Sequence, residues 1–355
     1  MGMRPLEAKR IVVLAPNWLG DAVMALPAMA SVCRTVSRSH VSVAARQSVS
    51  GLFELVHGFT DIVCLEGTWL RDAQLLKAGA YDVALLFPNS FRSALIARWA
   101  GIGECWGYCG DGRSLLLSTA VERPSALLHQ SDYYRHLIQA LAFSAETTHP
   151  CVDIPVRFIK PVYDQLQEHG YDGVSPLIVL APGAAYGTAR QWEPANVARL
   201  IKKLINNQDA VCVLVGAFND RVTGTAVLRA LEQELVTGSH VINLIGVTTV
   251  PELATLLALS NAYIGNDSGA SHLAAAVGTP VVTVFGPTNE HASAPMTGKK
   301  SGRVEVIAHQ VWCRPCMLRE CPIDHSCMTG VTPDSVYAAT LRVMALKDRS
   351  RNTIT

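Results

Sequence analysis

The chain has 355 residues, of which 49% are hydrophobic and 17% are charged, and its formal net charge is +1. This composition is that of a globular protein and excludes an intrinsically disordered one. The small net charge also excludes a broadly basic protein, so nucleic acid is not an expected partner. One hydrophobic core rarely supports a chain of this length, and two domains are therefore expected.

The sequence contains no run of about 18 apolar residues free of Gly, Pro and charge, so no membrane span is expected. Its first ten residues lead directly into an apolar strand and lack the pattern of a signal peptide. We therefore expect a cytoplasmic protein with reduced cysteines. Six of the ten cysteines are scattered singly, and we interpret most of these as small buried hydrophobic residues.

The first half of the chain alternates short apolar strands with helices. Strands are expected at 11–15, 41–45, 62–65, 83–87 and 104–107, and helices at 21–36, 48–56, 70–78, 91–100 and 132–143. This alternation predicts parallel βαβ units with right-handed crossovers. The aperiodic segment 145–155 predicts a domain boundary, which gives domains 1–150 and 151–355.

The second half repeats the pattern. Strands are expected at 177–181, 211–215, 241–244, 262–264, 281–285 and 303–307, and helices at 194–206, 219–235, 250–259, 270–277 and 333–346. The prediction is an α/β protein with two doubly wound domains. A substrate is expected in a cleft between the carboxyl ends of their strands.

The segment 262–287 reads as strand, polar turn, helix and strand. Asp267 and Ser268 stand at the expected N-cap, and Gly269 lets a ligand approach the backbone. His272 falls in the first helical turn. Helix N-termini bind anions through their free N–H groups, so this turn predicts a phosphate site.

The loop after the strand 177–181 reads A-P-G-A-A-Y-G-T-A-R-Q-W. Gly183 and Gly187 bracket a loop that precedes a helix, and the cation of Arg190 follows. Such a loop suits a diphosphate. The alternative is an ordinary loop with a solvated arginine, and the phosphate-type turn in the same domain favours the first interpretation.

The first strand of the chain leads into A-P-N-W-L-G-D, which lacks the G-x-G-x-x-G fingerprint of dinucleotide binding. Asp21 is either a plain helix N-cap or an ionised general base that faces the cleft, and the two roles are compatible. Asn17, Asn89, Arg92 and Arg113 are candidate contacts to an anionic acceptor. Each arginine could equally be a solvated surface cation.

Cys313, Cys316, Cys321 and Cys327 lie within fifteen residues, with His325 among them. The C-x2-C opening is typical of a zinc knuckle, although the later spacing is not. A compact reduced loop or a redox-sensitive pair is the competing interpretation, so a structural metal here is possible but is not expected.

Together these motifs resemble glycosyltransferase family 9, the heptosyltransferases of lipopolysaccharide synthesis. The resemblance covers nearly the whole chain, from A-P-N-W-L-G-D-A-V-M-A-L-P-A to C-R-P-C-M-L-R-E-C-P. It implies a GT-B fold of two facing Rossmann-like domains, with the acceptor in the first and the nucleotide-sugar in the second. It also implies that Asp21 is the general base and that Asp267, Ser268, Gly269 and His272 hold the donor diphosphate.

The resemblance further implies that Arg190 supplies a cation to the phosphate at a position where the family usually has lysine. Gln191, Glu193 and Ala185 also depart from the family pattern. The implied reaction is inverting transfer of heptose from ADP-heptose to the heptosyl-Kdo2-lipid A inner core, with no cofactor required. This work would take place at the cytoplasmic face of the inner membrane, by peripheral contact. A family 9 enzyme with another sugar nucleotide or acceptor is the alternative, and a non-catalytic nucleotide-sugar-binding protein is a further one.

Overall fold

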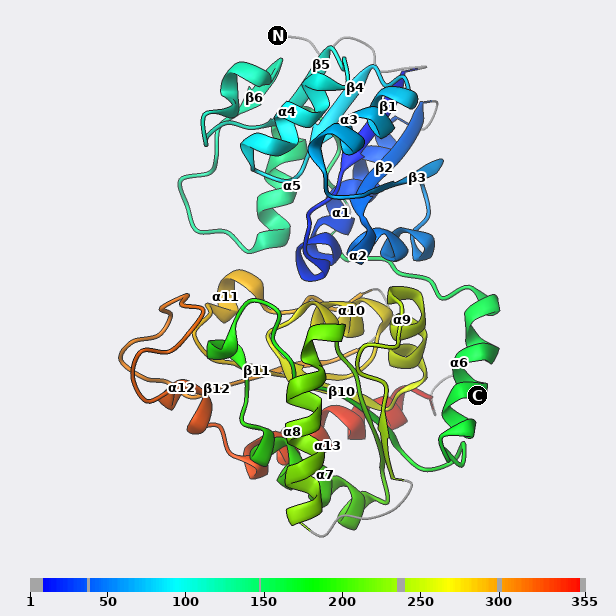
Figure 1. The fold of residues 1–355 in the computed structure, drawn as a ribbon, viewed down its shortest axis with the longest axis vertical. Helices are drawn as coiled ribbons and strands as arrows, with labels where there is room; N and C mark the ends of the chain where they lie inside the picture. Colours follow the sequence, from blue (N-terminus) through cyan, green and yellow to red (C-terminus); the bar gives the residue numbers. More distant parts are fainter. Residues whose placement is uncertain (1–8, 37–38, 147, 235–239, 299–301, 352–355) are drawn as a thin grey trace. The chain divides into compact units, whose positions relative to one another are not determined.

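The structure is a computed structural model that describes residues 9–36, 39–146, 148–234, 240–298 and 302–351. The chain divides into two compact units, residues 1–151 and 152–355 (Figure 1). The sequence places the boundary one residue earlier. Each unit contains one parallel sheet of six strands with helices packed against it.

The first unit has strands β1 (Arg10–Leu14), β2 (His40–Arg46), β3 (Asp61–Leu65), β4 (Val83–Leu86), β5 (Glu104–Tyr108) and β6 (Thr119–Val121). They are ordered β3-β2-β1-β4-β5-β6. Its helices are α1 (Leu19–Thr35), α2 (Gln47–Ser50), α3 (Trp69–Ala78), α4 (Phe91–Trp99) and α5 (Gln130–Ala140), with 3-10 turns η1 (Gly51–Leu55) and η2 (Arg113–Leu116). Helix α1 packs on α5, and α3 packs on α4.

The second unit has strands β7 (Leu177–Ala181), β8 (Val211–Leu214), β9 (Val241–Asn243), β10 (Ala262–Asn266), β11 (Val281–Phe285) and β12 (Val304–Ala308). Its longer helices are α6 (Val156–Glu168), α7 (Pro194–Gln208), α8 (Arg221–Gln233), α9 (Val250–Leu259), α10 (Gly269–Val277) and α13 (Pro333–Arg351). Short turns complete it: η3 (Thr188–Arg190), η4 (Phe218–Asp220), α11 (Glu290–Ser293) and α12 (Ser326–Thr329).

Both sheets have the same strand order, because β9-β8-β7-β10-β11-β12 repeats the path of β3-β2-β1-β4-β5-β6. The chain therefore winds outward in opposite directions from β1 and β4 in one unit and from β7 and β10 in the other. Such a change of direction opens a crevice at the carboxyl ends of the two central strands, where doubly wound proteins bind ligands. The predicted α/β fold with two doubly wound domains is confirmed.

The sequence pattern located the sheets because their central strands carry apolar side chains on both faces. All residues of β4, β7 and β11 are buried, as expected for parallel strands covered by helices on both faces. The sequence missed the edge strand β6 and helix α6. Strand β6 has only three residues, two of them exposed, so it carries no apolar run that would reveal it.

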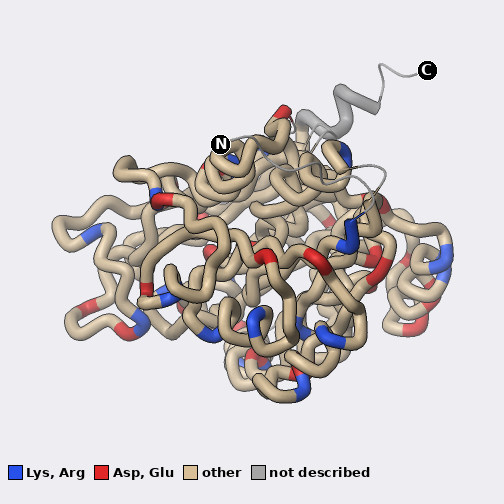
Figure 2. Tube along the Cα trace, turned by 90° about the horizontal axis from the view of Figure 1, so that it is seen from above, with Lys and Arg blue, Asp and Glu red and all other residues tan. Residues whose placement is uncertain are grey.

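Apolar side chains of α7, α8 and α13 share one core cluster with the central strands of the second unit. In the first unit, strands β1, β2 and β4 share a cluster with α3 and α4. None of the described helices is long and apolar enough to cross a membrane. Along the described trace, basic and acidic residues are interspersed (Figure 2).

All ten cysteines lie in the described part of the chain, and none of them forms a disulfide. Of the six scattered ones only Cys105 and Cys212 are buried, so the interpretation of most of them as buried hydrophobic residues is wrong. Cys33 and Cys109 are partly exposed, while Cys64 and Cys151 are exposed. Burial raises the pKa of the Cys212 thiol to about 12, which is the behaviour of an inert core cysteine.

Candidate functional site

Two loops meet at the switch point of the second sheet. One follows β7 and carries Gly183 and Arg190, and the other follows β10 and carries Asp267. Arg190 donates from Nη1 to Oδ2 of Asp267 over 3.1 Å, and their side chains are 17% and 5% exposed. The sequence predicted both residues separately, and the structure joins them as an ion pair.

The Asp267 side chain is almost fully buried, so the charge of its carboxylate depends on the groups around it. Burial raises the pKa of Asp267, while Arg190 and a hydrogen bond from Thr288 lower it. The Thr288 hydroxyl donates to the same Oδ2 over 2.8 Å. A carboxylate would repel a diphosphate, so we infer that Asp267 acts by holding Arg190 rather than by touching phosphate.

Asn266 ties the two loops together, and sequence reasoning missed this role. Its side-chain amide donates to the carbonyls of Pro182 and Gly183 over 2.9 and 3.1 Å. Its Oδ1 accepts the backbone N–H of Trp192 over 3.1 Å. The sequence placed Asn266 in the turn, whereas it is the last residue of β10. A polar residue that ends a fully apolar strand was the available signal.

Helix α10 begins where the phosphate-type turn was predicted. Ser268 is its N-cap and makes no side-chain capping bond, while Gly269 is the first helical residue. Asp267 precedes the cap, so its expected capping role is wrong. His272 lies buried in the first turn. The first backbone N–H groups of this nine-residue helix closely follow Asp267, the partner of Arg190.

Glycine is required at both ends of the Arg190 loop because neighbours crowd it. A Cβ on Gly183 would lie 2.2 Å from the Asp220 carboxylate, and one on Gly187 would lie 2.3 Å from the Arg319 carbonyl oxygen. Burial also raises the pKa of Asp220. Asp220 occupies the N-cap position of α8 without a side-chain capping bond, and its Oδ2 accepts the N–H of Ala217 over 2.8 Å.

In the first unit, Asp21 lies in the first turn of α1 and is partly exposed. Trp18 occupies the N-cap position, so the plain N-cap interpretation of Asp21 is wrong. Burial raises the pKa of Tyr134, and the nearby Asp21 carboxylate raises it further. Asp21 thus lies beside α5, at the carboxyl-end side of β1.

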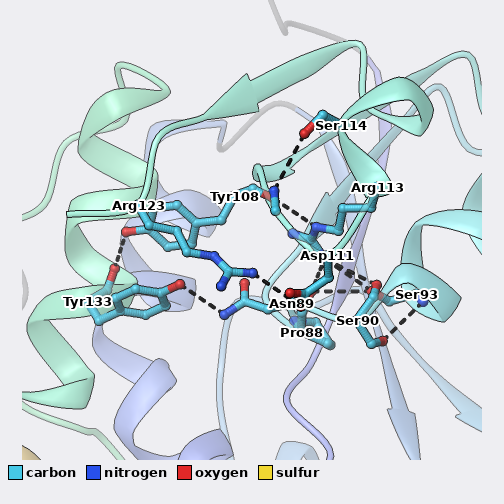
Figure 3. Close-up of polar contacts among 11 residues, drawn as sticks. Pro88, Asn89, Ser90, Ser93, Tyr108, Asp111, Arg113, Ser114, Arg123 and Tyr133 are labelled. Carbon is cyan, nitrogen blue, oxygen red and sulfur yellow. Dashed lines mark hydrogen bonds and ion pairs between the residues drawn. The ribbon is translucent and has the colours of Figure 1, made fainter. Parts of the chain in front are cut away.

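Arg113 was predicted to contact an acceptor, but its side chain is fully buried. Its Nε donates to the Tyr108 carbonyl over 2.7 Å, and Nη1 donates to the carbonyls of Pro88 and Ser90 (Figure 3). Burial lowers the pKa of Arg113, and the neighbouring Arg123 lowers it further. In this arrangement Arg113 fixes the loop after β4 to the end of β5.

Asn89 lies in that fixed loop and donates to the Tyr133 hydroxyl over 2.9 Å (Figure 3). Arg123 pairs with Asp111 over 3.3 Å, and both side chains are well exposed. The sequence analysis missed Arg123 and Tyr133. Of the other candidates, Asn17 is exposed, and Arg92 donates to the Gly67 carbonyl in the loop after β3.

The four clustered cysteines line one cavity of about 210 Å³ together with His325. His325 directs its Nε2 to the Ala189 carbonyl oxygen over 2.7 Å, so only its Nδ1 could serve as a metal ligand in this conformation. Among the described residues, no three His, Cys, Asp or Glu side chains are arranged to hold a metal ion. The expectation of a possible structural metal therefore gains no support from this geometry.

The model of the family described as glycosyltransferase family 9 (heptosyltransferase) matches residues 69–326. The chain belongs to glycosyltransferase family 9. It is 30% identical over 315 residues to lipopolysaccharide heptosyltransferase 2 of Salmonella typhimurium, across 82% of this chain and 86% of that protein. It is 29% identical to lipooligosaccharide heptosyltransferase 2 of Haemophilus influenzae, across 81% and 86%.

Solved structures agree with this assignment. The fold matches ADP-heptose LPS heptosyltransferase II of Escherichia coli with a TM-score of 0.80 and 25% identity, across 96% of this chain and 99% of that one. An E. coli heptosyltransferase with ADP shares the fold, with a TM-score of 0.67, 15% identity, and coverage of 93% and 98%. As a family 9 member this chain is a glycosyltransferase with the GT-B fold.

Proposed function

We propose that this family 9 enzyme transfers L-glycero-D-manno-heptose from ADP-heptose to the heptosyl-Kdo2-lipid A inner core of lipopolysaccharide, with inversion at the anomeric carbon. The observation that carries the proposal is the Arg190–Asp267 pair beside the N-terminus of α10, at the switch point of the second sheet. The similarity to heptosyltransferases 2 over four fifths of the chain supports the choice of sugar and acceptor.

The second unit supplies the groups that a nucleotide diphosphate needs. Negative charge grows on the departing ADP in the transition state, and a helix N-terminus and a guanidinium both stabilise such charge. Gly269 leaves the N-terminus of α10 open to phosphate oxygens, and His272 stands in the same turn. Because these groups belong to the chain, the proposed transfer requires no metal or cofactor.

Arg190 replaces the lysine that the family resemblance implies, and its surroundings suit the replacement. Its guanidinium lies 4.3 Å from the centre of the Tyr186 ring while Nη1 reaches Asp267. A planar guanidinium stacks on a ring and donates in its own plane at the same time, which an ammonium does not. Arg190 is thereby held in one orientation.

The first unit supplies the base and the acceptor contacts. Asp21 takes the proton from the attacking heptose hydroxyl, since it is a partly exposed carboxylate at a helix start. Asn89 and Asn17 are the polar candidates near the ends of β4 and β1, and Arg123 offers an exposed cation for an anionic inner-core group. Arg113 shapes this site through its loop. The enzyme meets its acceptor at the cytoplasmic face of the inner membrane, by peripheral contact.

Donor comparison tests the proposal. The purified chain is assayed with ADP-heptose, UDP-glucose and GDP-mannose against a heptosyl-Kdo2-lipid A acceptor. We expect kcat/KM to be at least about 100-fold higher for ADP-heptose, because a site built to hydrogen-bond one donor leaves polar groups unpaired when another donor binds. Turnover with ADP-heptose no better than with the other donors would select the alternative, a family 9 enzyme for a different sugar nucleotide.

A further inference from the structure

The segment from Trp312 to Cys327, which we call the cysteine-rich loop, packs on the loop after β7 and on the loop after β11. Arg314 is its main anchor, with a side chain only 3% exposed. Its Nε donates to the Gly286 carbonyl over 2.6 Å, and Nη2 donates to the Thr288 carbonyl over 3.3 Å. Nη2 also pairs with Glu290 over 2.9 Å, so the charge of Arg314 is neutralised locally.

A second set of contacts reaches the turn that carries Arg190. The Ala189 N–H donates to the Arg319 carbonyl over 2.9 Å, and the Ala189 carbonyl lies 2.7 Å from Nε2 of His325. The Arg319 guanidinium lies 4.9 Å from the centre of the Tyr186 ring, which Arg190 also contacts. The cysteine-rich loop therefore holds Ala189, the residue next to Arg190, by hydrogen bonds to the Ala189 backbone.

These contacts form a continuous path. Arg314 fixes the backbone of Thr288, and the Thr288 hydroxyl donates to Oδ2 of Asp267. The same oxygen accepts from Arg190. A buried carboxylate keeps its charge only while its donors stay in place, because burial favours the neutral form. The position of Thr288 thus affects both the charge of Asp267 and the orientation of Arg190.

We propose that the cysteine-rich loop positions the donor-binding guanidinium, and that Arg314 is a positioning residue acting on Arg190 through Thr288 and Asp267. This inference rests on the proposed role of Arg190 in binding the donor diphosphate. Arg314 donates its hydrogen bonds to Gly286, Thr288 and Glu290, so it acts on the bound sugar nucleotide indirectly. The loop then has a role that needs no metal at its thiols.

The test compares Arg314→Met and Arg314→Lys with wild type in the full chain, by calorimetric titration with ADP and by steady-state kinetics. We expect Arg314→Met to weaken ADP binding and to raise the KM of ADP-heptose by about tenfold, the scale of one charge-assisted hydrogen bond. Arg314→Lys should recover part of the loss, since a lysine donates to only some of the three acceptors. Arg342→Met is the matched control, because Arg342 pairs with Glu305 in the same unit and is 58% exposed.

A double-mutant cycle separates positioning from general stability. In an Arg190→Met background, Arg314→Met should change ADP affinity by less than about twofold, whereas a merely structural role predicts additive losses. If Arg314→Met does not fold, Thr288→Val replaces it, because that change removes only the hydroxyl bond to Asp267.

Wild type that fails to bind ADP would contradict the proposed function. If wild type binds ADP and a folded Arg314→Met variant binds ADP equally tightly, the positioning role is overturned and the proposed function stands.

Discussion

Arg190 and Asp267 form the polar centre of the second unit, and their coupling has a consequence for stability against pH. The pKa of Asp267 is raised by burial and held down in part by Arg190. A carboxyl group with a raised folded-state pKa stabilises the fold most below its unfolded pKa. That contribution is lost as pH rises through the folded pKa. Removing Arg190 extends the loss to higher pH.

We therefore predict that Arg190→Met destabilises the chain by about 2 kcal/mol at pH 7.5, less than a fully buried pair because Arg190 is partly exposed. At pH 5 the loss should be clearly smaller, since Asp267 is then closer to neutral. Calorimetric melting at both pH values measures the difference. In an Asp267→Asn background the pH dependence of the Arg190→Met effect should disappear. Equal losses at both pH values with Asp267 present would show that the pair is not coupled as described.

Asp21 is the residue on which catalysis depends in this account. We predict that Asp21→Asn lowers kcat by about 10²–10⁴-fold, the usual contribution of a general base. ADP affinity should not change, because the donor groups lie in the second unit. Asp334→Asn is the control, since Asp334 also occupies a first helical turn but pairs with Lys203. Transfer by Asp21→Asn within about tenfold of wild type would remove the base assignment.

At the scale of elements, Arg113 holds the loop after β4 to the end of β5. We predict that Arg113→Met destabilises the first unit by about 2–4 kcal/mol, because a buried guanidinium satisfies several carbonyls at once. Arg98→Met should cost less than about 1 kcal/mol, since the exposed Arg98 donates to only two carbonyls. Chemical denaturation measures both. A small loss of stability with a raised acceptor KM would instead indicate direct contact with the acceptor.

Sequence reasoning located most strands and helices, and it missed one short, exposed strand and one helix that contains a proline. The all-buried strands β7 and β11 were placed at their observed limits, because parallel strands are apolar on both faces. Strand β6 and helix α6 were missed, and α6 carries Pro161 in its interior, a residue that normally ends or kinks a helix. A strand that is buried on both faces is the element that a local apolar pattern predicts best.

The candidate site was predicted as residue types at strand ends, but not as contacts. Asp267 and Arg190 are 77 positions apart, and no local pattern indicates that they pair. The burial of Arg113 was equally hidden, because a lone arginine after a turn looks like a surface cation. Asn266, Thr288 and Arg314 follow from tertiary packing, which brings three loops together at one sheet edge.

At the scale of the whole molecule, each unit has its own sheet and its own core cluster. The proposed donor groups all belong to residues 152–355. We predict that this fragment alone binds ADP with a Kd within about threefold of the full chain, as expected of an independently folding domain. Residues 1–151 alone should not bind ADP. Calorimetric titration of both fragments decides, and ADP binding that requires both fragments together would contradict the division of roles.

The central claim is heptose transfer, and one measurement tests it most directly. The chain is incubated with ADP-heptose and heptosyl-Kdo2-lipid A, and the lipid product is weighed by mass spectrometry. The account predicts a product heavier by one heptose residue, formed by wild type and nearly absent with Asp21→Asn. An unchanged acceptor mass, from wild type that still binds ADP, would contradict the proposed transfer while leaving the fold and the family assignment in place.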